Sequence, residues 1–258
     1  MNIKNAIIMP FFIAVQFMTV LPITLASMPN PRQNALSVLY YPLIGLMIGG
    51  LLTLTAWVLS FLPLMVSSVM VLTVWVCLTG GLHLDGVADM ADGVVGGYGD
   101  KERTLAIMKD PNTGAMGVIA LVVVLLLKFS LIYALMEQNA LMWLIIVPII
   151  GRMMSLVLFL TTPYVRTDGI GKAMSDYLPK RTTWAVLGCW VLVLAVGLYG
   201  AGVLMVVLGA GFLGLAWGYR CYWRRRIGGM TGDIIGGAIE LTEVMMLVLM
   251  VGHLSGVS

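Results

Sequence analysis

Three aspartates lie close together in a chain that is otherwise strongly apolar. The stretch GGLHLDGVADMADGVVGG (residues 80–97) places Asp85, Asp89 and Asp92 four and then three positions apart, so on an α-helix they share one face. Like charges on one face repel, and the repulsion grows as the dielectric constant falls. A cation held between the carboxylates would relieve it. The alternative is a solvated helix end, but the small and apolar spacers favour close approach by a ligand.

Carboxylate oxygens select hard cations, so the expected ion is Mg²⁺, with Mn²⁺ as the second choice. Mg²⁺ commonly binds one or two carboxylates together with substrate phosphates, which predicts a phosphorylated ligand. A second acidic group opens the stretch GGMTGDIIGGAIELTEVMM (residues 228–246). The predicted metal ligands are Asp85, Asp89, Asp92 and Asp233.

A basic segment, GDKERTLAIMKDPNTGAMG (residues 99–117), follows the aspartates. Its Arg103, Lys109 and Asp110 are predicted to bind substrate, because cations beside a metal site suit phosphate. The alternative is the ordinary basic flank of a membrane helix. A Pro-Asn-Thr-Gly turn directly after Asp110 would hold Lys109 in place. His83, two residues before the first aspartate, is also a candidate substrate ligand, with a packed interfacial residue as its alternative.

Charged residues also occur within apolar segments. Lys128, Arg152, Glu240 and Glu243 fall at depths where ionisable groups are costly and point into a bundle interior. Structural ion pairing is one interpretation. The other is a polar cavity open to the cytoplasm, for which Lys128, Arg152 and Glu240 are the predicted substrate-binding residues.

The composition predicts an all-α, polytopic membrane protein. Of 258 residues, 60% are hydrophobic and 10% charged, against about 25% charged in soluble domains. Apolar runs reach the roughly 20 residues that cross a bilayer, and we expect seven to eight transmembrane segments in one domain, 1–258. The first expected segment could instead lie in the interface. The segments are 5–25, 36–60, 64–83, 114–136, 140–162, 183–199, 202–220 and 232–255.

The basic residues predict the orientation, because cytoplasmic loops are rich in lysine and arginine. If the aspartate stretch is cytoplasmic, Arg32 and the basic residues of 98–113, 164–183 and 220–226 lie inside, and Lys4 lies outside. The acidic face is therefore expected on the cytoplasmic side.

Glycines recur four residues apart within the expected spans, and this spacing predicts close helix packing. It also permits a homo-oligomer, whereas no nucleic-acid partner is expected. The pairs are Gly45 and Gly49, Gly214 and Gly218, and Gly232 and Gly236.

Familiar catalytic motifs are absent from the sequence. No stretch matches GxxxxGK followed by Ser or Thr, GxSxG or HExxH, which disfavours ATPases, triad hydrolases and zincins. An aspartate face that binds Mg²⁺ suits transfer of a phosphoryl group from a pyrophosphate, because the metal neutralises charge on the leaving phosphate.

Three motifs in order, GGLHLDGVADMADG, RTLAIMKDPNTGAMGV and GGMTGDIIGGAIELTE, closely resemble the cobalamin synthase family, the adenosylcobinamide-GDP ribazoletransferases. The N-terminal FFIAVQFMTVLPI is similar too, so the resemblance covers nearly the whole chain. It implies that a ribose hydroxyl of α-ribazole, or of its 5′-phosphate, attacks adenosylcobinamide-GDP. GMP leaves, and adenosylcobalamin or its 5′-phosphate forms. It also implies Mg²⁺ and a location in the bacterial inner membrane.

Under this resemblance, Asp85, Asp89, Asp92 and Asp233 would form the Mg²⁺ and pyrophosphate site. One of them is expected to act also as the base, with Asp92 as the first candidate. Arg103 and Lys109 would contact phosphate.

Two alternatives remain open. A lipid CDP-alcohol phosphotransferase uses similar chemistry, but its signature has Ala-Arg shortly after Asp-Gly, and no arginine follows Asp85-Gly86 so closely in this chain, which continues with Val87, Ala88 and Asp89. An ion transporter would use the acids as a permeation site, yet transporters usually place charges near the bilayer midplane, and here the densest acidic group is near the surface.

Overall fold

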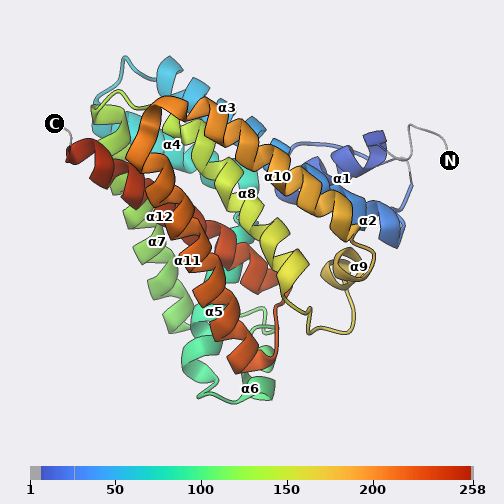
Figure 1. The fold of residues 1–258 in the computed structure, drawn as a ribbon. Coiled ribbons are helices and arrows are strands. Elements are labelled where there is room, and N and C mark those ends of the chain that lie inside the picture. Colours follow the sequence, from blue (N-terminus) through green and yellow to red (C-terminus); the bar gives the residue numbers. More distant parts are fainter. Residues whose placement is uncertain (1–6, 26, 257–258) are drawn as a thin grey trace.

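Long apolar helices run through the molecule and confirm the all-α prediction (Figure 1). The computed structural model describes residues 7–25 and 27–256, and in these ranges the only β-type pairing is one isolated bridge, between Tyr164 and Met230. The α-helices are α1 (Met9–Met18), α2 (Pro31–Ser37), α3 (Tyr41–Val58), α4 (Leu64–Thr79), α5 (Leu82–Gly96), α6 (Lys101–Ile107), α7 (Ala115–Glu137), α8 (Trp143–Thr161), α9 (Ile170–Asp176), α10 (Lys180–Gly197), α11 (Gly202–Ile227) and α12 (Gly232–Ser255), with short 3₁₀ turns at Val38–Tyr40 and Tyr199–Ala201.

Six helical runs in the described residues are long and apolar enough to cross a membrane, and the bent pair of α4 and α5 makes a seventh. The first expected segment, 5–25, is not seen as a span in its described part, residues 7–25. Its described part forms only α1, which has 10 residues, about half of what a bilayer requires. The structure therefore supports six or seven spans.

Two consecutive glycines separate α4 from α5. Gly80 and Gly81 have φ values of 63° and 67°, a left-handed conformation that glycine adopts without steric cost. The axis turns by 87° between the two helices. The predicted segment 64–83 is therefore wrong at its C-terminal end, because α4 stops at Thr79 and the chain leaves in a new direction as α5.

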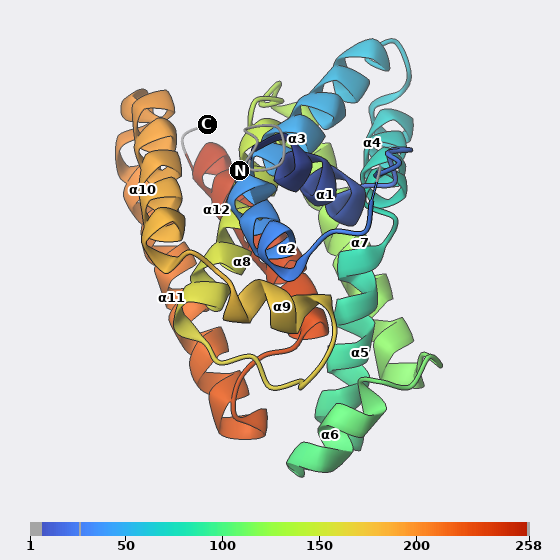
Figure 2. The same cartoon turned by 90° about the vertical axis from the view of Figure 1, so that its right-hand side faces the viewer.

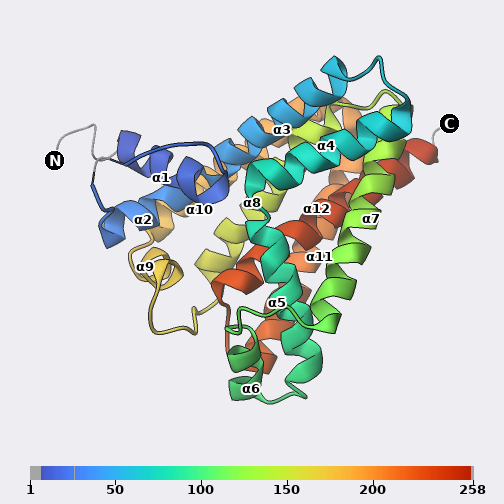
Figure 3. The same ribbon diagram turned by 180° about the vertical axis from the view of Figure 1, so that it is seen from behind.

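Helices α8 and α12 form the centre of the bundle. Buried residues make up 78% and 72% of their apolar windows, against 11% for α10 and 17% for the run that contains α11. Figure 2 shows α10 at the left margin of the molecule, and Figure 3 shows α7 at the right margin. A helix that is apolar all round but little buried is suited to contact with lipid.

Glycines allow α3 to pack closely on α8. A Cβ atom at Gly45 would lie 2.5 Å from the carbonyl oxygen of Pro148, and one at Gly49 would lie 2.5 Å from that of Ile145. Close packing at this glycine pair is confirmed.

The other two glycine pairs differ from each other in how closely they are packed. A Cβ atom at Gly236 would lie 3.3 Å from Cα of His83, and one at Gly232 would lie 3.8 Å from the Tyr164 hydroxyl. A Cβ atom at Gly214 or at Gly218 would have no neighbouring atom within 4 Å. The prediction of helix packing within the chain is therefore wrong for Gly214 and Gly218.

This contrast predicts opposite effects of one substitution. Gly45→Ala should lower the midpoint of thermal unfolding in detergent, because the new methyl group meets α8 backbone and overpacking typically costs about 1–3 kcal/mol. Gly214→Ala, the matched control in α11, should leave the midpoint unchanged or raise it, since alanine favours a helix interior. Equal midpoints for the two variants would contradict the close α3–α8 contact.

Candidate active site

Helix α5 carries the three aspartates on one face, as the spacing predicts. Asp89 is half-buried, and it interacts electrostatically with Asp85, Asp92 and Asp233. Asp233 comes from the first turn of α12. The other three predicted metal ligands thus lie near enough to Asp89 to act on it electrostatically, and the four aspartates are called the acidic group below.

A close helix contact makes this grouping possible. A Cβ atom at Gly86 would lie 2.5 Å from the carbonyl oxygen of Asp233. Glycine is therefore required where α5 crosses the start of α12. The spacer residue predicted to allow a ligand to approach instead allows another helix to approach.

Asp92 has a different environment from the other three aspartates. Its carboxylate accepts hydrogen bonds from the backbone N–H groups of Gly114, at 2.7 Å, and Gly117, at 2.9 Å. These amides belong to the N-terminus of α7, where N–H groups lack helical partners and negative charge is favoured. Asp92 therefore anchors α7 to α5, and both of its oxygens are engaged in doing so. This makes it a poorer candidate for the base than Asp85 or Asp89.

Asp233 is held by an arginine that the sequence analysis did not single out. The Arg166 guanidinium lies 2.6 Å from Asp233 Oδ2 and also donates to the Met108 carbonyl oxygen at 3.1 Å. The Thr231 hydroxyl donates to the same carboxylate at 3.2 Å. A basic residue in a predicted cytoplasmic loop gives no sequence signal that separates Arg166 from its neighbours.

The backbone explains how Arg166 reaches α12. The Val165 N–H donates to the Met230 carbonyl at 2.9 Å, and the Met230 N–H donates to the Pro163 carbonyl at 2.9 Å. These two bonds join the segment after α8 to the segment before α12. Burial raises the pKa of the Tyr164 phenol in this segment above its ordinary value, so the phenol stays protonated at neutral pH.

Asp85 and Asp89 accept no hydrogen bond from any described residue. Across residues 7–25 and 27–256, no group of three or more His, Cys, Asp or Glu side chains is arranged to hold a metal ion by itself. The residues fit an ion that takes one or two carboxylates and completes its shell with phosphate and water oxygens, which is how Mg²⁺ is commonly bound. They do not fit a metal site built from protein ligands alone.

The basic segment after α5 stays at the surface. Arg103, in α6, lies over the Tyr98 ring at 5.0 Å, and Lys109 is exposed. Asp110 accepts hydrogen bonds from the backbone and side chain of Asn112, which hold the pKa of its carboxyl below the usual range. The described contacts of Arg103 and Asp110 are local, so the substrate-binding role of this segment stays a prediction.

The four charged residues within the spans form one buried network. Lys128 Nζ lies 2.6 Å from Glu240 and 2.5 Å from Glu243, and Arg152 pairs with Glu243. Lys128 also lies over the Trp75 ring at 4.1 Å. Two positive and two negative charges thus come together from α7, α8 and α12.

None of these four residues lines either of the two main cavities. The ion-pairing interpretation is therefore the one that the geometry supports. A substrate-binding role for Lys128, Arg152 and Glu240 has no contact in its favour and stays a prediction.

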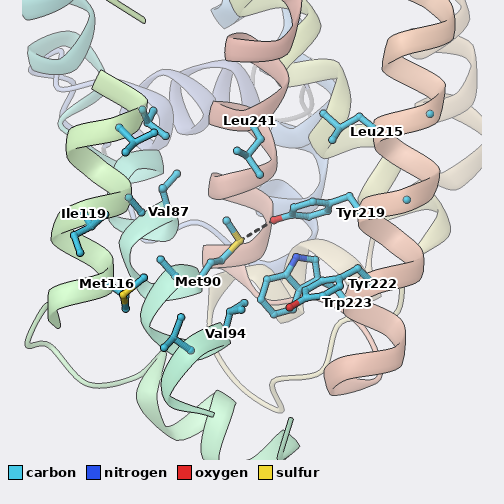
Figure 4. A pocket seen from close by; sticks show the side chains of 17 residues that line it. Val87, Met90, Val94, Met116, Ile119, Leu215, Tyr219, Tyr222, Trp223 and Leu241 are labelled. Carbon is cyan, nitrogen blue, oxygen red and sulfur yellow. Dashed lines mark hydrogen bonds between the residues drawn. The ribbon is translucent and has the colours of Figure 1, made fainter. Parts of the chain in front are cut away.

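The larger cavity is an apolar groove of about 730 Å³ between α5, α7, α11 and α12. Figure 4 shows Met90, Tyr219 and Trp223 along it, with the Tyr219 hydroxyl donating a hydrogen bond to the Met90 sulfur. Helical spacing puts Val87 and Met90 on the side of α5 opposite Asp85 and the other aspartates. This groove is therefore not the acidic site.

A smaller cavity of about 200 Å³ does reach the acidic site. His83, Asp85 and Asp233 line it, together with aromatic residues that include Tyr41 and Phe159. The predicted candidate His83 is thus placed beside the carboxylates, on the wall of a cavity.

The fold and the site together define a polytopic helical membrane protein with an acidic site formed by α5 and the first turn of α12. Residues 10–251 match the cobalamin-5-phosphate synthase family. The chain belongs to this family.

Relatives match over almost their full lengths. An adenosylcobinamide-GDP ribazoletransferase of Acinetobacter baumannii is 48% identical over 92% of this chain and 95% of its own length. A protein of the same name from Pseudomonas fluorescens is 48% identical over 93% of this chain and 98% of its own. No solved structure matches. These matches give no support to the lipid phosphotransferase or the ion transporter.

The buried network predicts unequal costs for removing its two acids. Glu243→Gln should destabilise the protein strongly, because it leaves Arg152 without an acidic partner among the described residues, and breaking a buried ion pair costs about 3–5 kcal/mol. Glu240→Gln should cost less, since Lys128 keeps Glu243. Thermal unfolding of purified protein in detergent would measure both.

Asp176→Asn is the control for this series, because Asp176 forms an exposed pair with Lys172 in α9 and such pairs contribute little. Equal destabilisation by Glu243→Gln and Asp176→Asn would contradict a structural role for the network.

Proposed function

We propose that this chain joins α-ribazole, or its 5′-phosphate, to adenosylcobinamide-GDP and releases GMP. The observation that carries the proposal is the acidic group of α5 and α12, in a chain whose family and relatives have that activity in their names. In the reaction, a ribose oxygen bonds to the phosphorus that stays on the cobinamide. The bond from that phosphorus to the GMP oxygen breaks, and the hydroxyl proton passes to a carboxylate.

Asp85, Asp89 and Asp233 would hold Mg²⁺ through one or two carboxylates at a time, together with the pyrophosphate. When bound, Mg²⁺ neutralises charge on the pyrophosphate and on the departing GMP. Asp85 and Asp89 have no hydrogen-bonding partner among the described residues, so either carboxylate is free to accept the proton of the attacking hydroxyl.

Arg166 supports the phosphate end of the site. Its contacts with Asp233 and the Met108 carbonyl orient the guanidinium, and a fixed guanidinium binds phosphate oxygens well. Asp92 contributes indirectly in this proposal, by fastening α7 to the helix that carries the other aspartates.

The site is proposed to face the cytoplasm of the bacterial inner membrane. The exposed basic helix α6 and the last turn of α11, with Arg224, Arg225 and Arg226, lie at the same end of the molecule (Figure 2). Arg226 donates to the Gly93 and Val94 carbonyls near the end of α5. Basic residues at that end agree with the positive-inside rule.

Asp89→Asn should reduce GMP release from adenosylcobinamide-GDP, α-ribazole 5′-phosphate and Mg²⁺ by at least about 100-fold, a typical loss when an acid–base group is removed. The amide keeps the size of the side chain but cannot ionise. Formation of the cobamide and of GMP by purified protein would be followed together.

Glu137→Gln is a suitable control, since Glu137 is exposed at the end of α7, and it should keep wild-type turnover. Wild-type turnover in Asp89→Asn would remove Asp89 from the site, and a wild-type protein that forms no cobamide would overturn the proposed function.

A further inference from the structure

His83 is a buried polar side chain without a partner. It is 3% exposed, and neither ring nitrogen makes a hydrogen bond within the described residues. Buried polar groups are nearly always paired, because leaving one unpaired is costly. An unpaired imidazole on the wall of a cavity therefore indicates a ligand atom that completes it.

The cavity beside His83 is small and partly lined by aromatic residues. Phe17 and Tyr41 stack at 6.2 Å between ring centroids, with planes 13° apart, and Phe159 and Tyr164 add further aromatic surface. The Tyr41 hydroxyl already donates a hydrogen bond to the Met174 sulfur. Flat apolar walls of this kind suit a planar ring system.

We propose that this cavity binds the benzimidazole base of α-ribazole, with His83 donating a hydrogen bond to the ring nitrogen that is not attached to ribose. This inference rests on the proposed function and names where one of its two substrates lies. In every protonation state of histidine, at least one ring nitrogen carries a hydrogen, so the imidazole can serve as this donor.

The size of the cavity indicates which part of the two substrates it can hold. About 200 Å³ is less than the roughly 300–1,000 Å³ of pockets that enclose a whole drug-sized ligand. The cavity is therefore suited to a bicyclic ring and too small for the corrinoid.

The number of polar groups in the ring decides between the two bicyclic bases of the substrates, the guanine of adenosylcobinamide-GDP and the benzimidazole of α-ribazole. Guanine carries several donors and acceptors that would each need a partner when buried. Benzimidazole in a riboside has one free acceptor nitrogen, and His83 is the one unpartnered buried side chain among the described residues of this cavity. One donor matches one acceptor.

The position of the cavity also fits the reaction. Asp85 and Asp233 lie on its wall beside His83. A base bound in this cavity would therefore bring its ribose near these carboxylates, where the attacking hydroxyl is needed.

The test compares α-ribazole with an analogue whose base is indole, which has a C–H group in place of the free ring nitrogen. Inhibition constants are measured for both ribosides as competitors of α-ribazole 5′-phosphate, so the analogue need not react. Wild-type protein should bind the benzimidazole riboside about 3- to 10-fold more tightly, the usual worth of one net hydrogen bond.

His83→Leu should abolish this preference, and His83→Gln, which retains an N–H donor, should keep part of it. The KM for adenosylcobinamide-GDP should stay unchanged in both variants. A His83→Leu protein that still prefers benzimidazole, or that loses affinity for GMP or adenosylcobinamide-GDP instead, would overturn the inference while leaving the proposed function intact.

A second variant covers the case in which His83→Leu does not fold. Ile170 is 53% exposed and lines the same cavity, so Ile170→Trp should fold and narrow the space. It should raise the KM for α-ribazole 5′-phosphate several-fold, and Leu213→Trp, at an exposed position on α11, should not. An unchanged KM in Ile170→Trp overturns the inference, whereas absence of turnover in wild-type protein overturns the proposed function and the inference together.

Discussion

The close crossing of α5 and α12 is the contact on which the acidic site depends. Gly86 lets the backbone of α5 lie against the carbonyl of Asp233, and Asp233 then acts electrostatically on Asp89 of α5. Such crowding of negative charge is unfavourable without a cation. Arg166 supplies part of the compensation, and the remainder is available to a metal ion and substrate phosphates. The helix crossing thus creates the electrostatic need that binding would satisfy.

The buried charge network gives this crossing a rigid frame. Glu243 stands between Lys128 and Arg152 and so connects α7, α8 and α12 inside the bundle. Charges withdrawn from water stabilise little by themselves, but a misaligned helix would leave one of them unpaired at high cost. The network therefore favours one register of α12 against its neighbours, and α12 is the helix that delivers Asp233.

Sequence patterns predicted the elements better than the contacts between them. The span 232–255 coincides with α12, and 114–136 differs from α7 by one residue at each end, because hydropathy and flanking glycines are local signals. The bend after α4 also had a local signal, the pair Gly80 and Gly81. The partners of Asp92 lie 22 and 25 residues away, and the salt bridge of Arg166 spans 67. Such pairings arise from tertiary packing, which no local window contains.

The anchoring of Asp92 to the first turn of α7 also connects the site to the lipid around it. Helix α7 has 23 residues and little buried surface, and a span of this kind changes its tilt when bilayer thickness changes. Through the two amide bonds to Asp92, such a tilt would be transmitted to the helix that carries Asp85 and Asp89. Membrane composition thereby has a mechanical route to the geometry of the carboxylates.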